Sequence, residues 1–284
     1  MQSIQHWRAV LATLPLLAAC GGERPAEQAL SPDGIPIAYE VHGTGSPALV
    51  FVHGWSCDRG YWAGQLEPFS REHRVVAVDL AGHGASGLGR EAWTMEAFGG
   101  DVAAVVEQLG LERVILIGHS MGGDVIVAAA RQLPGRVAGL IWIDTYRRLT
   151  SPRTPEELRA MMTPFRSLDF VGTTRTFVRA MFPPTADSAL VERVAMDMSA
   201  APLTVALGAL EHAMSFDREI PPALEELNLP VVAINADYQP TDVASLERHG
   251  VEVVIMPGVG HFLMLEDPER FNELLAGAVE RLGR

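Results

Sequence analysis

A serine enclosed by glycines, standing between an apolar run and a helix-forming run, constrains the fold of this chain most strongly. Residues 113–117 are mainly β-branched and apolar and predict a buried strand, whereas residues 124–131 favour a helix. A G-x-S-x-G sequence in this setting is typical of a sharp turn that presents a nucleophile. Such a turn strains the backbone at Ser120, so Gly118 and Gly122 supply positions without bulk. We therefore predict that Ser120 is a nucleophile.

Length and composition predict one core domain with an insertion. The chain has 284 residues, of which 48% are hydrophobic and 20% are charged, which suits a globular protein with an ample core. Its formal net charge of −13 argues against nucleic acid as a partner and against electrostatic docking to anionic lipid.

The amino-terminal segment has a different character from the rest of the chain. Its apolar run, residues 9–19, is interrupted by Pro15 and is too short to span a bilayer, but it has the length of a signal-peptide core. The run ends in Ala18-Ala19-Cys20-Gly21, which resembles the lipobox of bacterial lipoproteins.

This resemblance implies that residues 1–19 are a signal peptide and that lipid on Cys20 anchors the protein to a membrane of the cell envelope, on the periplasmic face or at the cell surface. An ordinary cleaved signal or a cytosolic leader are the alternatives. Residues 20–30 are polar and rich in Gly, Pro and Glu, which predicts a tether.

Beyond the tether, predicted strands alternate with predicted helices. This alternation is typical of a mostly parallel, doubly wound α/β sheet covered on both faces, which we assign to residues 31–145 and 223–284. Helices are expected over residues 94–109 and 268–282. The predicted strands are residues 35–41, 48–52, 74–78, 113–117, 137–143, 230–235 and 251–256.

The alternation stops between residues 146 and 222, where no strand is predicted. This stretch is rich in Met, Phe and Ala and is divided by prolines, so we expect a helical cap inserted into the sheet domain. Its predicted helices are residues 155–162, 168–181, 187–198 and 203–215.

Together with the serine turn, three further stretches resemble those of the α/β-hydrolase fold superfamily, over roughly residues 31–284. They are His53-Gly54-Trp55 after an early strand, Asp79-Leu80-Ala81-Gly82-His83-Gly84-Ala85-Ser86 after the next, and Gly260-His261-Phe262 near the end. Their order and strand context make the resemblance far more specific than any one motif.

The resemblance implies roles for several of these residues. His261 stands at the family position of the base that takes the proton of Ser120. The backbone N–H groups of Trp55 and Met121 would form the oxyanion hole. The other motif histidines, His53, His83 and His119, are expected to fix loops or to belong to the oxyanion loop.

The acid that orients His261 is left with more than one candidate. Family order places it between the serine and the histidine, and Asp237 follows the penultimate strand where the acid usually lies. The chain lacks the usual glycine and longer turn before that position. Asp144 and Asp242 therefore remain alternatives, Asp144 because some relatives place the acid after the preceding core strand.

These features predict a hydrolase that cleaves a carboxylic ester through a covalent acyl-enzyme, with no cofactor and no metal. The expected substrate is a small acyl compound, uncharged and partly apolar. An amidase, lactonase, thioesterase, C–C bond hydrolase, perhydrolase or acyltransferase would use the same machinery. A non-catalytic binding protein tethered to the surface is the alternative from a different class. Cys57 is expected to be a packed or lightly exposed thiol.

Overall fold

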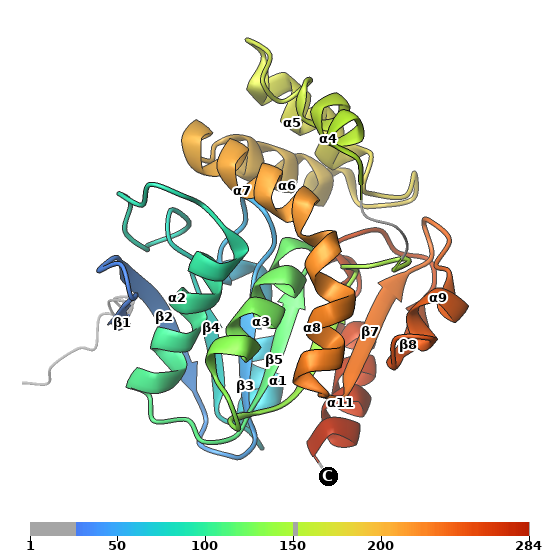
Figure 1. Cartoon of the computed structure of the whole chain (residues 1–284). Coiled ribbons are helices and arrows are strands. Elements are labelled where there is room, and N and C mark those ends of the chain that lie inside the picture. Colours follow the sequence, from blue (N-terminus) through green and yellow to red (C-terminus); the bar gives the residue numbers. More distant parts are fainter. Residues whose placement is uncertain (1–26, 150–152, 284) are drawn as a thin grey trace, which may run out of the picture.

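A computed structural model describes residues 27–149 and 153–283 (Figure 1). The predicted signal peptide and Cys20 lie outside the described residues. Within the described part, no single helix is both long and apolar enough to cross a membrane, although the bent pair Ser188–Ser199 and Leu203–Leu227 passes by length and composition together.

The core is a sheet of eight strands in the order β1-β2-β4-β3-β5-β6-β7-β8. All pairs are parallel except β1–β2 and β2–β4. The mostly parallel, doubly wound sheet is therefore confirmed. The strands are β1 (Glu27–Leu30), β2 (Pro36–His42), β3 (Ala48–Val52), β4 (Val75–Val78), β5 (Val114–His119), β6 (Val137–Ile143), β7 (Val231–Ala236) and β8 (Val251–Met256).

The prediction of a tether up to residue 30 is wrong for its last four residues, which form β1. Ala29 is buried, and Glu27 pairs with Tyr39 of β2 while Leu30 pairs with Pro36. The side-chain amide of Gln108 also donates a hydrogen bond to the carbonyl oxygen of Gln28, at 2.7 Å. This polar segment is held by its backbone rather than by a hydrophobic run.

Helices cover both faces of the sheet, as Figure 1 shows. On one face lie α2 (Met95–Gln108), α3 (Met121–Gln132) and α8 (Ile220–Leu227), and on the other lie α1 (Ala63–Ser70) and α11 (Pro268–Gly283). Thr94 caps α2 by accepting a hydrogen bond from the N–H of Ala97. The short elements are η1 (Arg59–Trp62), η2 (Phe216–Glu219), α9 (Val243–Glu247) and α10 (Leu263–Glu266).

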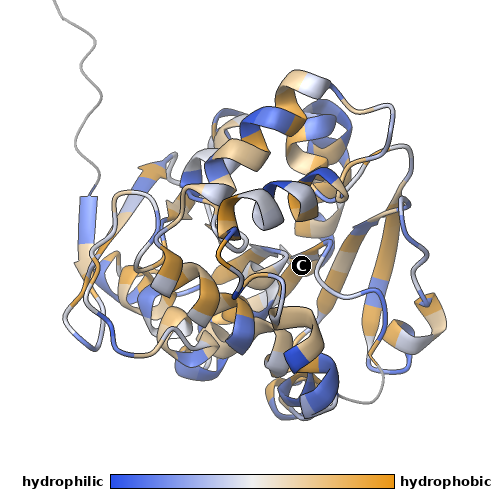
Figure 2. Ribbon diagram, turned by 90° about the horizontal axis from the view of Figure 1, so that it is seen from above, coloured by the Kyte–Doolittle hydropathy of each residue, from blue (hydrophilic) through white to orange (hydrophobic). Residues whose placement is uncertain are grey.

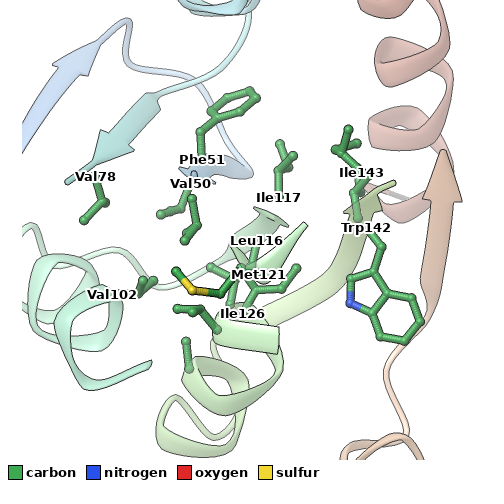
Figure 3. Close-up of a cluster of buried hydrophobic side chains, with 14 of the residues drawn as sticks. Val50, Phe51, Val78, Val102, Leu116, Ile117, Met121, Ile126, Trp142 and Ile143 are labelled. Atoms are coloured by element: carbon green, nitrogen blue, oxygen red, sulfur yellow. The ribbon is translucent and has the colours of Figure 1, made fainter. Parts of the chain in front are cut away.

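The central strands are buried on both faces, which explains why they are apolar without alternation. Figure 3 shows Val50, Leu116, Ile117 and Ile143 together with Met121 of α3, all packed in this core. Burying one such side chain contributes roughly 1.5–3 kcal/mol to stability. This packing fixes the carboxyl ends of β3, β5, β6 and β7, from which the loops of the site emerge.

A helical cap is inserted between β6 and β7 and lies beyond the carboxyl ends of the strands (Figure 1). The view from above in Figure 2 looks onto this side of the molecule. The cap contains α4 (Pro155–Met162), α5 (Phe170–Arg179), α6 (Ser188–Ser199) and α7 (Leu203–Ser215). The predicted boundary at residue 222 falls inside α8, a helix that packs against α3 of the core. The inserted cap itself is therefore complete before α8 begins.

Candidate active site

Ser120 occupies the turn between β5 and α3 in a strained conformation. Its φ of 52° and ψ of −120° lie outside the regions that residues other than glycine favour. A Cβ atom on Gly118 would stand 2.2 Å from the carbonyl oxygen of Gly122, and one on Gly122 would stand 2.5 Å from that of Val52. Both glycines are therefore required by close approach, as the sequence predicted.

Ser120 is half-buried and lines a cavity of about 510 Å³. His261, which follows β8, and Asp144, which follows β6, line the same cavity. The described residues offer the Ser120 hydroxyl no side-chain hydrogen bond, and in free enzymes catalytic hydrogen bonds are often long. The cap contributes an apolar wall made of Met161, Phe177, Met181, Met198, Leu210 and Met214.

The imidazole of His261 is paired with Asp144. Its Nδ1 lies 2.6 Å from Oδ2 of Asp144, and both side chains are buried. Because a carboxylate only accepts hydrogen bonds, Nδ1 carries the proton in this pair. The Nε2 atom of His261 is then the nitrogen that can accept a proton.

Asp144 is held by donors from two further directions. The N–H of Ala236, at the end of β7, donates to its Oδ1 at 2.9 Å. Nη2 of Arg147 donates to Oδ1 and Oδ2 at 2.7 and 2.9 Å. Like Ser120, Asp144 has a positive φ, of 48°. The carboxylate is thus fixed both by the loop that follows β6 and by the end of β7.

The prediction that Asp237 orients His261 is wrong in this structure. Asp237 is exposed, and its Oδ1 accepts a hydrogen bond from the N–H of Gly258 at 2.8 Å. It therefore ties the loop before His261 to the end of β7 and does not contact the imidazole. Asp242 is also exposed and caps α9 by accepting from the N–H of Ser245. Of the three candidates, Asp144 is the one placed on His261.

Met121 and Trp55, whose backbone N–H groups are predicted to form an oxyanion hole, belong to segments that meet at Ser120. Met121 is the first residue of α3, whose amino terminus carries a partial positive charge. The loop of Gly54 and Trp55 packs on the turn, since a Cβ on Gly54 would be 3.3 Å from the Cβ of Ser120. The Trp55 ring reaches the cap, where its Nε1 donates to the carbonyl oxygen of Ala206 at 2.7 Å.

Three buried histidines near the site hold loops and stay neutral. Burial lowers the pKa of His53 to about 4, that of His83 to about 3, and that of His119 well below its usual range. Nδ1 of His53 lies 2.8 Å from the carbonyl oxygen of Gly54, and its Nε2 accepts from the N–H of Leu80. Nε2 of His119 donates to the carbonyl oxygen of His261 at 2.9 Å. These contacts fix the loops around Ser120.

A polar pair that we did not predict lines the cavity one helical turn beyond Ser120. The Tyr146 hydroxyl donates to Oδ1 of Asp124 at 2.5 Å. Burial raises the pKa of Asp124 to about 7, so near neutral pH part of this carboxyl group is protonated. The available signal was the position of Asp124 in the first turn of α3, directly after the serine turn.

Cys57 is buried, and its thiol lies 3.4 Å from the carbonyl oxygen of Trp55. Burial raises the pKa of this thiol well above its usual range, which suppresses the reactive thiolate. Of the two predicted possibilities, a packed or a lightly exposed thiol, the structure has the packed one.

Comparison with known proteins gives, over most of the chain, the α/β-hydrolase family that the sequence motifs resemble. The model of the "Alpha/beta hydrolase family" matches residues 49–274. The pimeloyl-[acyl-carrier protein] methyl ester esterase of Yersinia enterocolitica is 28% identical over 252 residues, covering 84% of this chain and 95% of that protein. A thermophilic esterase from Thermogutta terrifontis superposes with a TM-score of 0.77 at 27% identity, covering 92% of this chain and all of that one.

Other curated relatives match over shorter lengths. The non-heme haloperoxidase of Rhodococcus erythropolis is 41% identical over 113 residues, which is 39% of this chain and 41% of that protein. The match to the dihydrolipoyllysine-residue acetyltransferase component of the acetoin cleaving system of Cupriavidus necator spans 28% of that protein, at 37% identity over 37% of this chain. The two esterases described above, from Yersinia enterocolitica and Thermogutta terrifontis, indicate an enzyme of the hydrolase type.

The family model spans well over half of the chain, and the fold and the serine turn agree with it. This protein therefore belongs to the alpha/beta hydrolase family.

Proposed function

We propose that the protein hydrolyses a carboxylic ester with Ser120 as nucleophile, His261 as base and Asp144 as the acid that orients His261. The hydrogen bond from Nδ1 of His261 to Oδ2 of Asp144 carries the proposal, because it leaves Nε2 unprotonated beside the cavity that Ser120 lines. The family membership and the esterases among its relatives support the reaction type.

In the proposed reaction, Oγ of Ser120 attacks the ester carbonyl carbon while Nε2 of His261 takes the hydroxyl proton. The resulting oxyanion is stabilised by the N–H groups of Met121 and Trp55. The tetrahedral intermediate collapses, and His261 gives the proton to the leaving alcohol. A water molecule then attacks the acyl-enzyme by the same route and releases the acid and free Ser120. Asp144 stabilises the imidazolium in both halves.

The cavity favours a substrate with one apolar part and one polar part. Methionines and Phe177 of the cap line it together with the polar pair of Asp124 and Tyr146. Met side chains adapt to irregular apolar groups, and a hydroxyl–carboxyl pair can exchange hydrogen bonds with a polar group. A compact, uncharged ester fits a cavity of about 510 Å³.

The test is covalent labelling by a fluorophosphonate together with a panel of acyl esters, amides and lactones. We expect the probe to add to Oγ of Ser120 with loss of fluoride, which peptide mass spectrometry locates, and the Ser120→Ala variant to remain unlabelled. Hydrolysis of esters should exceed that of matched amides. If folded wild-type protein is not labelled and hydrolyses no member of the panel, the proposal fails and the non-catalytic binding protein is favoured.

We also propose that the protein is a lipoprotein of the cell envelope, anchored through Cys20. The support is the sequence Ala18-Ala19-Cys20-Gly21 after the apolar run, which lies outside the described residues. Cells expressing the full chain should incorporate a palmitate analogue and retain the protein in the membrane fraction. The Cys20→Ser variant should lose both. Equal membrane retention of both forms, without palmitate, would contradict the anchor.

A further inference from the structure

Arg147 contacts Asp144, the proposed acid, and also joins it to the segment at the end of β7. Its Nη2 donates to both carboxylate oxygens of Asp144, and the two side chains are 17% and 1% exposed. Its Nη1 donates to the carbonyl oxygens of Ala236 and Gln239, at 2.8 and 2.7 Å. The guanidinium also lies over the ring of Tyr238, 4.6 Å from its centre.

We propose that Arg147 is a positioning residue that clamps Asp144 between the loops after β6 and β7 and opposes protonation of His261 in the free enzyme. This inference rests on the proposed function, in which Asp144 acts through His261.

The geometry supports a clamp and argues against a substrate-binding role. Both Nη groups donate to protein atoms, so neither is free to bind a substrate carboxylate. Nη2 donates to both carboxylate oxygens of Asp144 while Nη1 donates to two backbone carbonyl oxygens, and the single ammonium of a lysine cannot hold both sets of acceptors at once. Stacking on Tyr238 holds the plane of the guanidinium. Asp144 therefore has little freedom to rotate away from His261.

The electrostatic effect follows from the charges that face His261. Asp144 favours the imidazolium, and Arg147 offsets part of this negative charge. Glu266, from α10, faces the same loop, and its carboxylate accepts from the N–H groups of Gly260 and Phe262. His119 from the serine turn and Tyr238 after β7 are uncharged near neutral pH, because burial lowers the pKa of the first and raises that of the second to about 12. Arg147 thus supplies the positive charge that directly contacts Asp144, the hydrogen-bond partner of His261.

The first measurement is the pH dependence of kcat/KM for Arg147→Gln and Arg147→Lys. Loss of the positive charge in Arg147→Gln should move the acid limb up by about one pH unit. Arg147 and His261 contact the same carboxylate, and a neighbouring charge shifts a protonation equilibrium by about that amount. Its kcat should fall about 10- to 100-fold through loss of orientation, with KM nearly unchanged. Arg147→Lys should keep the acid limb near that of wild type while lowering kcat, because it keeps the charge but loses the second nitrogen that joins Asp144 to the loop after β7.

Arg248→Gln is the matched control, because it removes the same charge from an exposed position just after α9. It should leave both kcat and the acid limb as in wild type. Thermal unfolding followed by circular dichroism establishes that each variant is folded. A folded Arg147→Gln protein with an unmoved acid limb would overturn the electrostatic part of the proposal, and a wild-type kcat in Arg147→Lys would overturn the clamp.

A second readout does not depend on turnover. The proton shared by Nδ1 of His261 and Asp144 should give a downfield signal in the proton NMR spectrum, and its pH titration reports protonation of the imidazole. The midpoint should rise in Arg147→Gln and stay in place in Arg147→Lys. Absence of this rise overturns the inference, whereas absence of labelling and hydrolysis in wild type overturns the proposed function.

Discussion

Replacing Ser120 by alanine should lower kcat for ester hydrolysis by a factor on the order of 10⁶, and His261→Ala should do about the same. Without Oγ no acyl-enzyme forms, and without the imidazole the hydroxyl keeps its proton. Because the two groups act in one step, the double variant should be no slower than either single variant. A small residual rate above that of water should remain, because the backbone N–H groups of Met121 and Trp55 are intact.

The measurement is single-turnover hydrolysis of an activated ester by the purified variants, with the melting temperature as a check on folding. Ser70→Ala is the matched control, since its hydroxyl donates to the carbonyl oxygen of Glu67 on the protein surface and should leave kcat unchanged. Turnover by Ser120→Ala within tenfold of wild type would show that another nucleophile operates. Additive losses in the double variant would show that Ser120 and His261 do not act in one step.

The central part of the fold could be predicted because its strands are buried on both faces. Strands β3, β6 and β8 have the predicted bounds, and β2, β4, β5 and β7 differ by one or two residues at one or both ends. Burial on both faces requires uninterrupted apolar runs, which stand out in a sequence. The serine turn could also be predicted, because it requires glycine at two positions where a side chain would collide with residues nearby in the sequence or with β3.

The first strand could not be predicted in this way. Glu27 and Gln28 are exposed, and Ala29 is the buried side chain of β1. An edge strand of this kind is held by backbone hydrogen bonds to β2, which leave no hydrophobic pattern in its own residues. The polar composition that suggested a tether is therefore compatible with a paired edge strand.

The choice of acid was wrong for a related reason. Asp144 and Asp237 follow neighbouring parallel strands, so both reach the same edge of the sheet. Which carboxylate turns toward His261 depends on loop contacts distant in sequence, in particular Ala236 donating to Asp144 and Gly258 donating to Asp237. Arg147, three residues after Asp144, could have indicated a carboxylate held in place, but the sequence alone does not show that its guanidinium turns back to Asp144.

Asp144→Asn should lower kcat by roughly 10⁴, whereas Asp237→Asn should leave it within a few-fold of wild type. The amide cannot hold the proton on Nδ1 of His261 as a carboxylate does, so Nε2 is more often protonated and unable to take the proton of Ser120. The same substitution at Asp237 weakens the hydrogen bond that it accepts from Gly258 in an exposed loop, so we expect it to loosen that loop rather than to affect the reaction.

The two variants form a matched pair, since each changes one aspartate at the end of an adjacent strand into its isosteric amide. Asp144→Asn also leaves Arg147 without its carboxylate partner, so some loss of melting temperature is expected there. The kinetic loss should nevertheless persist at temperatures where both variants are fully folded. If Asp237→Asn lost the activity and Asp144→Asn kept it, the loops after β6 and β7 would have to exchange places on His261 when substrate binds, and the assignment of Asp144 would be abandoned.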